Sequence, residues 1–258
     1  MLFVHEYKEF LMAMQQSETR NRLLSLLPHD DFLALAPHLL PIALPKGYLI
    51  ARAQQEMAHA YFLEAGIGSI VAHSPEGQKA ETGLVGREGV LPVAFALDVS
   101  ISSQEIIMQV EGHGLRIESG VLRELLASRP RVRQIMSRFA HAMWIQTAQT
   151  ALSNAVHTVE ERLARWLLMC LDRVDDGEIA LTHEYMAIML AVRRASVTTA
   201  LHVLEGNRFI HADRGRVIVR DRKALEAFAA DAYGAPELEY GRLIGPLTAW
   251  SRPRGIEA

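Results

Sequence analysis

The residues best suited to chemistry lie close together between Leu181 and Asp221. All seven basic residues of segment 181–222 are arginines, and serine, threonine and histidine side chains lie among them. Arginine can bind O6 and N7 of guanine together, Ser and Thr hydroxyls can bind base edges or phosphates, and a Thr methyl can contact the thymine methyl. We therefore expect a double-stranded DNA interface made of Arg193, Arg194, Ser196, Thr198, Thr199, His202, Arg208, Arg214 and Arg216.

The expected roles within this set differ. Arg194 begins a helix and is expected to read a base, although a solvated helix arginine is the alternative. The three arginines near the following hairpin are expected to contact phosphates, which sets register without reading sequence. DNA contact and a plain surface position both stay open for Ser196, Thr198, Thr199 and His202, and Arg193 can equally cap the turn.

Two short helices and a hairpin are expected to position these residues. Thr182 is a suitable N-cap for a first helix, and after Ala191 and Val192 only a tight turn fits before a second helix from about Arg193 to Glu205. Asp213 to Gly215 form a turn between two strand-like runs. This order predicts a helix-turn-helix followed by a wing.

Charge is distributed unevenly along the 258 residues. The net charge of −3 argues by itself against a nucleic-acid binder, but segment 1–130 carries −5 and segment 181–222 carries +3. The pattern indicates that the second half meets an anion and that the first half has another role.

Catalytic and metal-binding signatures are absent from the sequence. It has no Gly-x-Ser-x-Gly elbow, phosphate loop or dinucleotide fingerprint, and Gly112-His113-Gly114 fits a strand-end turn. The histidines lack ligand spacing, and a lone Cys170 on an apolar helix face is expected to be a buried thiol. We expect no enzyme activity, no metal and no cofactor.

The first half has the texture of a small antiparallel β domain. Short apolar runs such as Tyr48–Ile50, Tyr61–Leu63 and Glu105–Val110 are separated by glycines, and segment 73–78 is typical of a hairpin tip.

Glycine and proline then become rare, which predicts a long helix over 126–156. Its apolar face is expected to pair with a second copy of the chain through Ile135, Phe139, Ala142 and Met143. Packing of that face on its own barrel is the alternative.

These motifs together resemble the Crp/Fnr family of bacterial transcription regulators, over nearly the whole chain. Glu161–Leu168, Leu181-Thr182-x-Glu184, the helix-turn-helix and the wing stand in that family's order, as do Leu44–Gly47, Tyr61–Gly66 and Gly86–Gly89 in the first half. The resemblance implies an α+β fold: an N-terminal antiparallel β-roll (a double-stranded β-helix, cyclic-nucleotide-binding-like, 1–125), a dimerisation helix (126–156), a C-terminal winged helix-turn-helix (157–232) and a tail (233–258).

The chain departs from this family in its effector cassette. Relatives that bind cyclic nucleotides pair Gly-Glu with an Arg followed by Ser or Thr, whereas segment 102–106 contains no arginine to neutralise a phosphate. We therefore expect no control by cyclic AMP and an unknown effector. The residues expected to line the pocket are Gly86, Arg87, Glu88, Gly89, Ser102, Ser103 and Gln104.

A second departure lies in the recognition helix. Many relatives have Arg-Glu and a later Arg there, whereas this chain keeps Arg194 but has Ala195 and Thr199. Its preferred DNA sequence is expected to differ from theirs. The cysteine cluster of oxygen-sensing relatives is also absent, since the chain has one cysteine.

The resemblance implies a homodimeric regulator that binds a near-palindromic operator. It also implies that the roll acts on a hinge near 155–158 and that RNA polymerase is a candidate partner.

The longest apolar run, Tyr185–Val192, is too short to span a bilayer, and the N-terminus lacks a signal-peptide pattern, so we expect a cytoplasmic protein without membrane contact. Two alternatives stay open: a ligand-binding or protein-interaction module whose helix-turn-helix does not read DNA, and a regulator whose roll is only a dimer platform.

Overall fold

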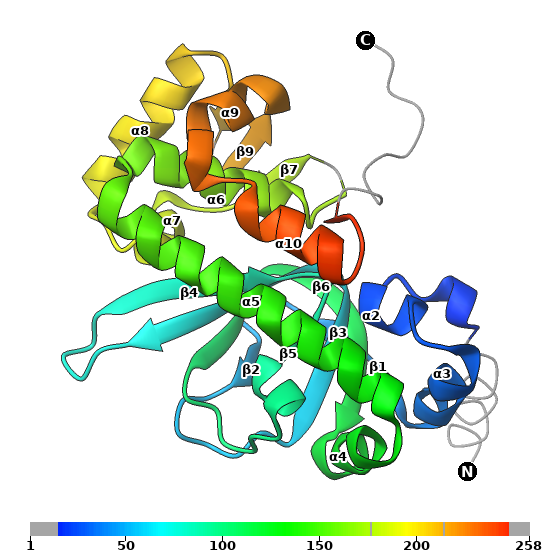
Figure 1. The fold of residues 1–258 in the computed structure, drawn as a ribbon. Helices are drawn as coiled ribbons and strands as arrows, with labels where there is room; N and C mark the ends of the chain where they lie inside the picture. The colour runs from blue at the N-terminus through cyan, green and yellow to red at the C-terminus, as the bar shows by residue number, and fades with distance from the viewer. Residues whose placement is uncertain (1–14, 176, 214, 248–258) are drawn as a thin grey trace. The chain divides into compact units, whose positions relative to one another are not determined.

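The computed structural model describes residues 15–175, 177–213 and 215–247. The chain forms two compact units, Met1–Trp144 and Ile145–Ala258. Helix α5 (Pro130–Val156) begins in the first unit and ends in the second (Figure 1). The second unit therefore starts earlier than the expected domain boundary at residue 157.

The first unit combines short helices with an antiparallel sheet. Its strands are β1 (Leu40–Leu44), β2 (Leu49–Ala51), β3 (His59–His73), β4 (Lys79–Val85), β5 (Val90–Leu91) and β6 (Glu105–Glu118). Its helical elements before α5 are η1 (Gln16–Glu18), α2 (Arg22–Ser25), α3 (His29–Leu35), η2 (Ala36–His38), η3 (Val93–Leu97) and α4 (Ser119–Ser128). The expected mostly β first domain is confirmed.

The long strands β3 and β6 hold this sheet together. The strand order is β1-β6-β3-β4, with β2 on β6 and β5 on β3, and every pairing is antiparallel. Apolar side chains on these strands, among them Phe62, Leu63 and Ile67, are buried. The turn at Ser74–Gln78 joins β3 to β4, as the hairpin-tip pattern predicted.

Two glycines allow β3 and β6 to bend across each other. Gly66 has φ +85°, and a Cβ atom there would lie 2.7 Å from the Val110 carbonyl oxygen. A Cβ atom on Gly112 would lie 2.0 Å from the Ala65 carbonyl oxygen. The pairing register shifts on both sides of Ala65, which marks a β-bulge. The two backbones approach so closely at this bulge that only glycine fits at positions 66 and 112.

The expected helix over 126–156 is two helices. Arg129, between α4 and α5, is extended (φ −120°, ψ 90°). The ring of Pro130 clashes with a helical conformation of the residue before it, so the helix breaks at Arg129. Residues 126–128 therefore belong to α4.

The side chains expected to form the dimer face are mostly packed inside their own chain. Phe139, Ala142 and Met143 are buried, and Ile135 is half-buried. A Cβ atom on Gly89 would lie 2.1 Å from the Phe139 ring, so that ring packs on the turn after β4. The opposite face of α5 is apolar and exposed, with Trp144, Ala148, Ala151, Leu152 and Ala155. Helical periodicity shows both stripes but does not say which one faces the protein's own sheet.

The second unit is mainly helical with a small sheet. Its elements are α6 (Val159–Leu171), β7 (Glu178–Ala180), α7 (His183–Met189), α8 (Arg194–Gly206), β8 (Ile210–Asp213), β9 (Arg216–Val219), α9 (Arg222–Ala229), η4 (Ala230–Ala232) and α10 (Ala235–Leu243). The antiparallel strand order is β7-β9-β8. Apolar side chains of α6, α8 and β9, including Leu167, Leu201 and Val217, form its core.

The segment after residue 232 is more than a tail. Helix α10 follows η4 after Tyr233 and Gly234, and its Tyr240 is buried. Residues 233–247 therefore extend the second unit beyond the expected winged helix-turn-helix.

Candidate nucleic-acid interface

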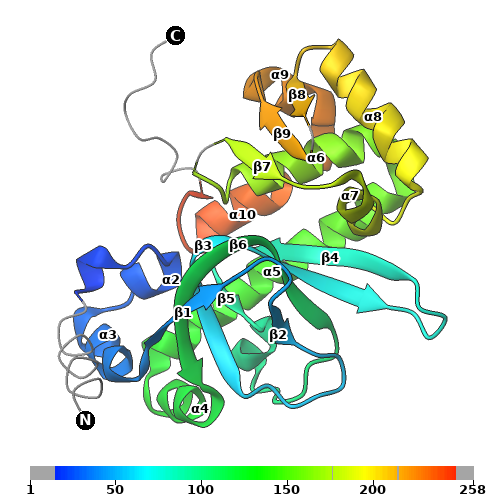
Figure 2. The same ribbon diagram turned by 180° about the vertical axis from the view of Figure 1, so that it is seen from behind.

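Helices α7 and α8 form the helix-turn-helix. The Thr182 side chain accepts a hydrogen bond from the Tyr185 N–H and so caps α7, as predicted. The tight turn contains Ala191 at φ +50°, and the two helix axes differ by 103°. This angle lies within the range of helix-turn-helix motifs. Figure 2 shows α7, α8 and the hairpin β8–β9 in one domain.

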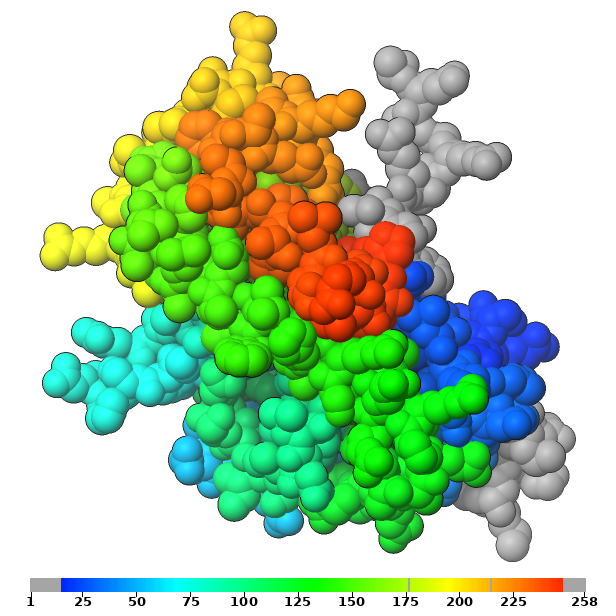
Figure 3. Space-filling view, in the orientation of Figure 1, coloured from blue at the N-terminus to red at the C-terminus, as the bar shows by residue number. Residues whose placement is uncertain are grey.

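One face of α8 packs inside the unit and the opposite face is exposed. Val197, Ala200, Leu201 and Leu204 are buried. Side chains of the α7–α8 segment, drawn in yellow, project from the surface in Figure 3. The exposed residues of α8 include Arg194, Ala195, Thr199, His202 and Val203.

Among the predicted contact residues, the two threonines have different surroundings. The Thr198 hydroxyl lies 3.2 Å from the Arg194 carbonyl oxygen and 3.1 Å from His183 Nδ1, and its side chain is half-buried. The Thr199 hydroxyl donates to the Ala195 carbonyl oxygen on the exposed face. Thr198 therefore braces α7 against α8, and Ser196 is also half-buried. His183 is not among the predicted contact residues, because it meets Thr198 only through the fold.

The arginines around the motif fall into two groups. Arg193, Arg194 and Arg208 are exposed and have no ion pair among the residues that the structure describes. Arg220, at the end of the wing, shares this property and was not predicted. Arg216 instead donates to Glu178 of β7 over 2.9 Å. Arg214 lies outside the described residues. The unpaired guanidinium groups are the ones free to bind an anion.

Glu205 connects the recognition helix to the wing. Its Oε1 accepts from the Ala212 N–H (3.1 Å) and lies 3.1 Å from His211 Nδ1. The hydrogen bond from Ala212 N–H and the proximity of His211 hold the pKa of the Glu205 carboxyl below its usual value. These contacts fix the start of β8 relative to the end of α8.

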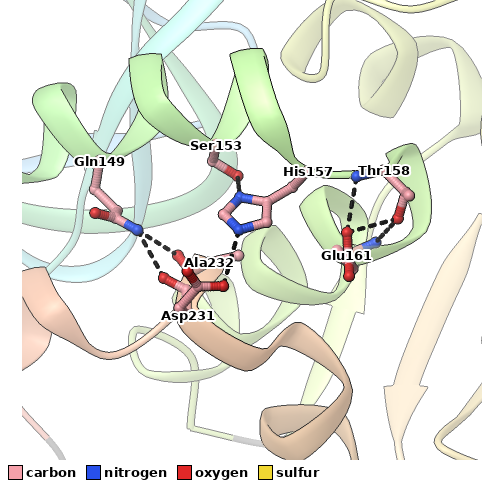
Figure 4. Close-up of polar contacts among 7 residues, drawn as sticks. All are labelled: Gln149, Ser153, His157, Thr158, Glu161, Asp231 and Ala232. Carbon is pink, nitrogen blue, oxygen red and sulfur yellow. Dashed lines mark hydrogen bonds and ion pairs between the residues drawn. The ribbon is translucent and has the colours of Figure 1, made fainter.

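A polar cluster connects the end of α5 to η4 (Figure 4). His157 Nε2 lies 3.0 Å from Asp231 Oδ1, and His157 Nδ1 lies 3.1 Å from the Ser153 hydroxyl. Gln149 Nε2 donates to the Asp231 carbonyl oxygen over 2.8 Å. The hydrogen bond from His157 holds the pKa of the Asp231 carboxyl below its usual value. We call this cluster the α5–η4 latch, and it lies next to the expected hinge at 155–158.

The predicted effector residues lie in two segments of the first unit. In the turn 86–89, Glu88 accepts from the Gly86 N–H, and the Gly89 carbonyl oxygen accepts from Asn21 Nδ2 over 2.7 Å. Arg87 is buried. At the start of β6, the Ser102 hydroxyl donates to the Gln104 carbonyl oxygen, and Gln104 Nε2 donates to Thr82 Oγ1 over 3.0 Å, whereas Ser103 is exposed. Segment 102–104 supplies hydroxyl and amide groups but no cation.

Two further features were searched for in the described ranges 15–175, 177–213 and 215–247. They contain no group of three or more His, Cys, Asp or Glu side chains arranged to hold a metal ion. No single helix in them is long and apolar enough to cross a membrane, and α7 and α8 satisfy that criterion only as a pair bent by 103°.

Comparison with known proteins finds one matching domain family and many solved structures of similar fold. Residues 161–228 match the family model of the Crp-like helix-turn-helix domain. FixK2 from Bradyrhizobium japonicum superposes with a TM-score of 0.65 at 14% identity, covering 74% of this chain and 98% of its own. A Crp/Fnr family regulator from Eubacterium rectale gives 0.62 at 15% identity, covering 80% and 97%. The c-di-GMP-responsive regulator CLP from Xanthomonas campestris gives 0.60 at 15% identity, covering 74% and 99%. No curated protein sequence matches the chain.

The second half of the chain thus contains a Crp-like helix-turn-helix domain, and the fold class is α+β. Over 74–80% of its length the chain has the fold of Crp/Fnr transcription regulators, which confirms the resemblance stated from its motifs. These structural relatives are regulators rather than enzymes.

Proposed function

We propose that this protein is a sequence-specific DNA-binding transcription regulator that acts as a homodimer. The observation that carries the proposal is the exposed face of α8, which begins with Arg193 and Arg194, whose guanidinium groups make no ion pair within the described ranges. A helix of this kind enters the major groove with its N-terminal residues against base edges. Arg208 and Arg220 flank the wing and are suited to phosphates.

The exposed stripe of α5 supports the dimer. Trp144 is 68% exposed and Leu152 is 49% exposed, with alanines between them that allow close helix approach. Burial of such a stripe against a second copy removes apolar surface from water. Two-fold symmetry then requires inverted half-sites about one helical turn of DNA apart.

Cyclic AMP is not the effector in this proposal. A buried cyclic phosphate needs a cation, and segment 102–104 offers only Ser and Gln side chains. Calorimetric titration of the full chain with cyclic AMP should show no saturable binding at millimolar nucleotide. Micromolar binding would overturn this part of the proposal.

The main test is selection of bound fragments from a random DNA library by the purified chain, at about physiological salt and without added ligand. An enriched inverted repeat supports the proposal. Its affinity should then fall steeply as salt rises, because phosphate contacts release counterions. If nothing is enriched, the selection is repeated with small-molecule cell extract, and renewed failure favours a module whose helix-turn-helix does not read DNA.

A further inference from the structure

The face of α8 that points away from its own domain has an apolar centre. At 3.6 residues per turn, Ala195, Thr199 and His202 lie opposite the buried side of the helix, and all three are exposed. The buried side includes Val197 and Leu201. Ala195 carries only a methyl group, so the first turn at the centre of this face makes no side-chain hydrogen bond.

The hydroxyl of Thr199 is engaged within the helix. Its Oγ1 donates to the Ala195 carbonyl oxygen over 3.2 Å, and a hydroxyl has a single proton to donate. Donation to a base requires that this bond be given up, and exchanging one hydrogen bond for another gains little net free energy. Thr199 therefore offers a partner its methyl group and, through the oxygen, an acceptor.

Apolar groups continue along α8 on both sides of Thr199. Ala195 lies one turn before it and Val203 one turn after it, and side chains four residues apart are neighbours on a helix surface. Val203 is a large hydrophobic side chain that remains 37% exposed. The three residues form a line of apolar groups, which we call the α8 methyl line.

The surroundings of the α8 methyl line indicate what covers it. Arg193 and Arg194 lie at the start of the same helix, and neither makes an ion pair within residues 15–175, 177–213 and 215–247. Cations beside an apolar line suit DNA, whose phosphates flank a groove with base edges at its floor. In the major groove, thymine alone among the four bases presents a methyl group, and alanine and threonine methyls pack on it.

We propose that Thr199 is a specificity-determining residue that selects thymine in each operator half-site by contact between its methyl group and the thymine methyl, with Ala195 beside it. Burial of the methyl groups against each other removes apolar surface from water. The inference rests on the proposed DNA-binding function and deepens it, because it names the chemical group that is read next to the base bound by Arg194.

The test uses the operator recovered by the library selection. Each thymine of one half-site is replaced in turn by deoxyuridine, which keeps every hydrogen-bonding group of thymine and lacks the methyl. Equilibrium binding should weaken about fourfold at one or two of these positions, the equivalent of ~0.8 kcal/mol for one buried methyl group.

Two variants of Thr199 separate its methyl group from its hydroxyl. Thr199→Ser keeps the hydroxyl and removes the methyl, so its affinities for the thymine and uracil operators should become equal. Thr199→Val keeps a methyl and removes the hydroxyl, and should still prefer thymine.

The matched control is Thr198→Ser, which removes a methyl group one residue away. That side chain is half-buried and its hydroxyl lies 3.1 Å from His183 Nδ1, so the preference for thymine should be unchanged. Urea denaturation establishes that each variant is folded before binding is measured.

Three results would overturn the inference. They are equal affinity for thymine and uracil at every half-site position, an unchanged thymine preference in Thr199→Ser, and a thymine preference that Thr199→Val loses and Thr199→Ser keeps, which would assign the reading to the hydroxyl. The failure of the proposed function is distinguishable from these. If the unsubstituted chain selects no operator, both fall, whereas an operator without a methyl effect overturns this inference alone.

Discussion

Arg194 and Thr198 lie one turn apart on α8, yet only one of them is free to bind DNA. Arg194 is exposed and unpaired within the described residues, whereas the Thr198 hydroxyl is held by the Arg194 carbonyl oxygen and by His183. A hydroxyl that already bonds within the protein gains little by turning to a base. Arg194 and the exposed Thr199 and His202 are therefore the stronger candidates for base contact.

Arg194→Ala should weaken binding to the selected operator by about 1–3 kcal/mol, because a bidentate contact to guanine is lost. Arg194→Lys keeps the charge but not the two-pronged geometry. Competition binding should show that Lys recovers little of the loss if Arg194 reads a base. Full recovery by Lys would make Arg194 a phosphate contact instead.

Ala191 holds a left-handed conformation (φ +50°) in the turn between α7 and α8. A Cβ atom in this conformation destabilises the folded state by about 1–2 kcal/mol, and glycine removes that strain. Glycine also raises the conformational entropy of the unfolded chain, which offsets part of the stabilisation. Ala191→Gly should therefore raise the free energy of unfolding by about 0.5–1 kcal/mol in urea denaturation. Ala227→Gly, on the exposed side of α9, is the control and should lower it by a similar amount.

The parts of the candidate site that depend only on neighbouring residues in the sequence were predictable. The Thr182 cap and the buried face of α8 follow from spacing alone, and the structure agrees with both. The bond between His183 and Thr198 joins two helices at an angle, and no local pattern encodes it. Likewise, the exposure of Arg208 and the pairing of Arg216 with β7 depend on how the wing folds back.

At the scale of elements, the latch ties α5 to the segment after α9. Asp231 has a lowered pKa because His157 donates a hydrogen bond to its ionised carboxylate. A lowered folded-state pKa means that the stabilisation is complete above the ordinary pKa of an aspartate and is lost as pH falls through the lowered value.

Asp231→Asn should therefore lower the unfolding free energy at pH 6, and the difference from the unsubstituted chain should shrink as pH falls below the ordinary pKa of an aspartate. Urea denaturation across this range measures it. In a His157→Ala background the same substitution should have a much smaller pH-dependent effect, because only the backbone hydrogen bond at Asp231 then lowers the pKa of its carboxyl. An undiminished pH-dependent effect without His157 would show that Asp231 acts through another group.

Element prediction succeeded for long periodic segments and failed for short or interrupted ones. Strand β7 has three residues, too few to show an alternation. Helix α10 lies in the segment that was expected to be a tail, and its Pro236 and Gly241 are residues typical of helix ends. The break at Arg129–Pro130 interrupts an apolar repeat that predicts one continuous helix, although Pro130 itself is a helix-boundary signal.

At the scale of the whole molecule, the exposed stripe of α5 is expected to form the interface of the proposed dimer. Leu152→Glu places a charge on the stripe, and a desolvated charge opposes its burial. Sedimentation equilibrium should give twice 28.8 kDa for the unsubstituted chain and 28.8 kDa for this variant at micromolar concentration. Asn154→Glu adds the same charge to another exposed face and should leave the dimer intact. A monomeric unsubstituted chain would contradict the proposed dimer.

The length of α5 has a geometric consequence for control of DNA binding. Its 27 residues make a rod of about 40 Å at 1.5 Å per residue. Tilting such a rod by about 5° at one end displaces the other end by roughly 3.5 Å, about the rise of one base-pair step. In the proposed regulator, a tilt of about 5° at one end of α5 would therefore be enough to move its other end by one base-pair step and so to change register on DNA.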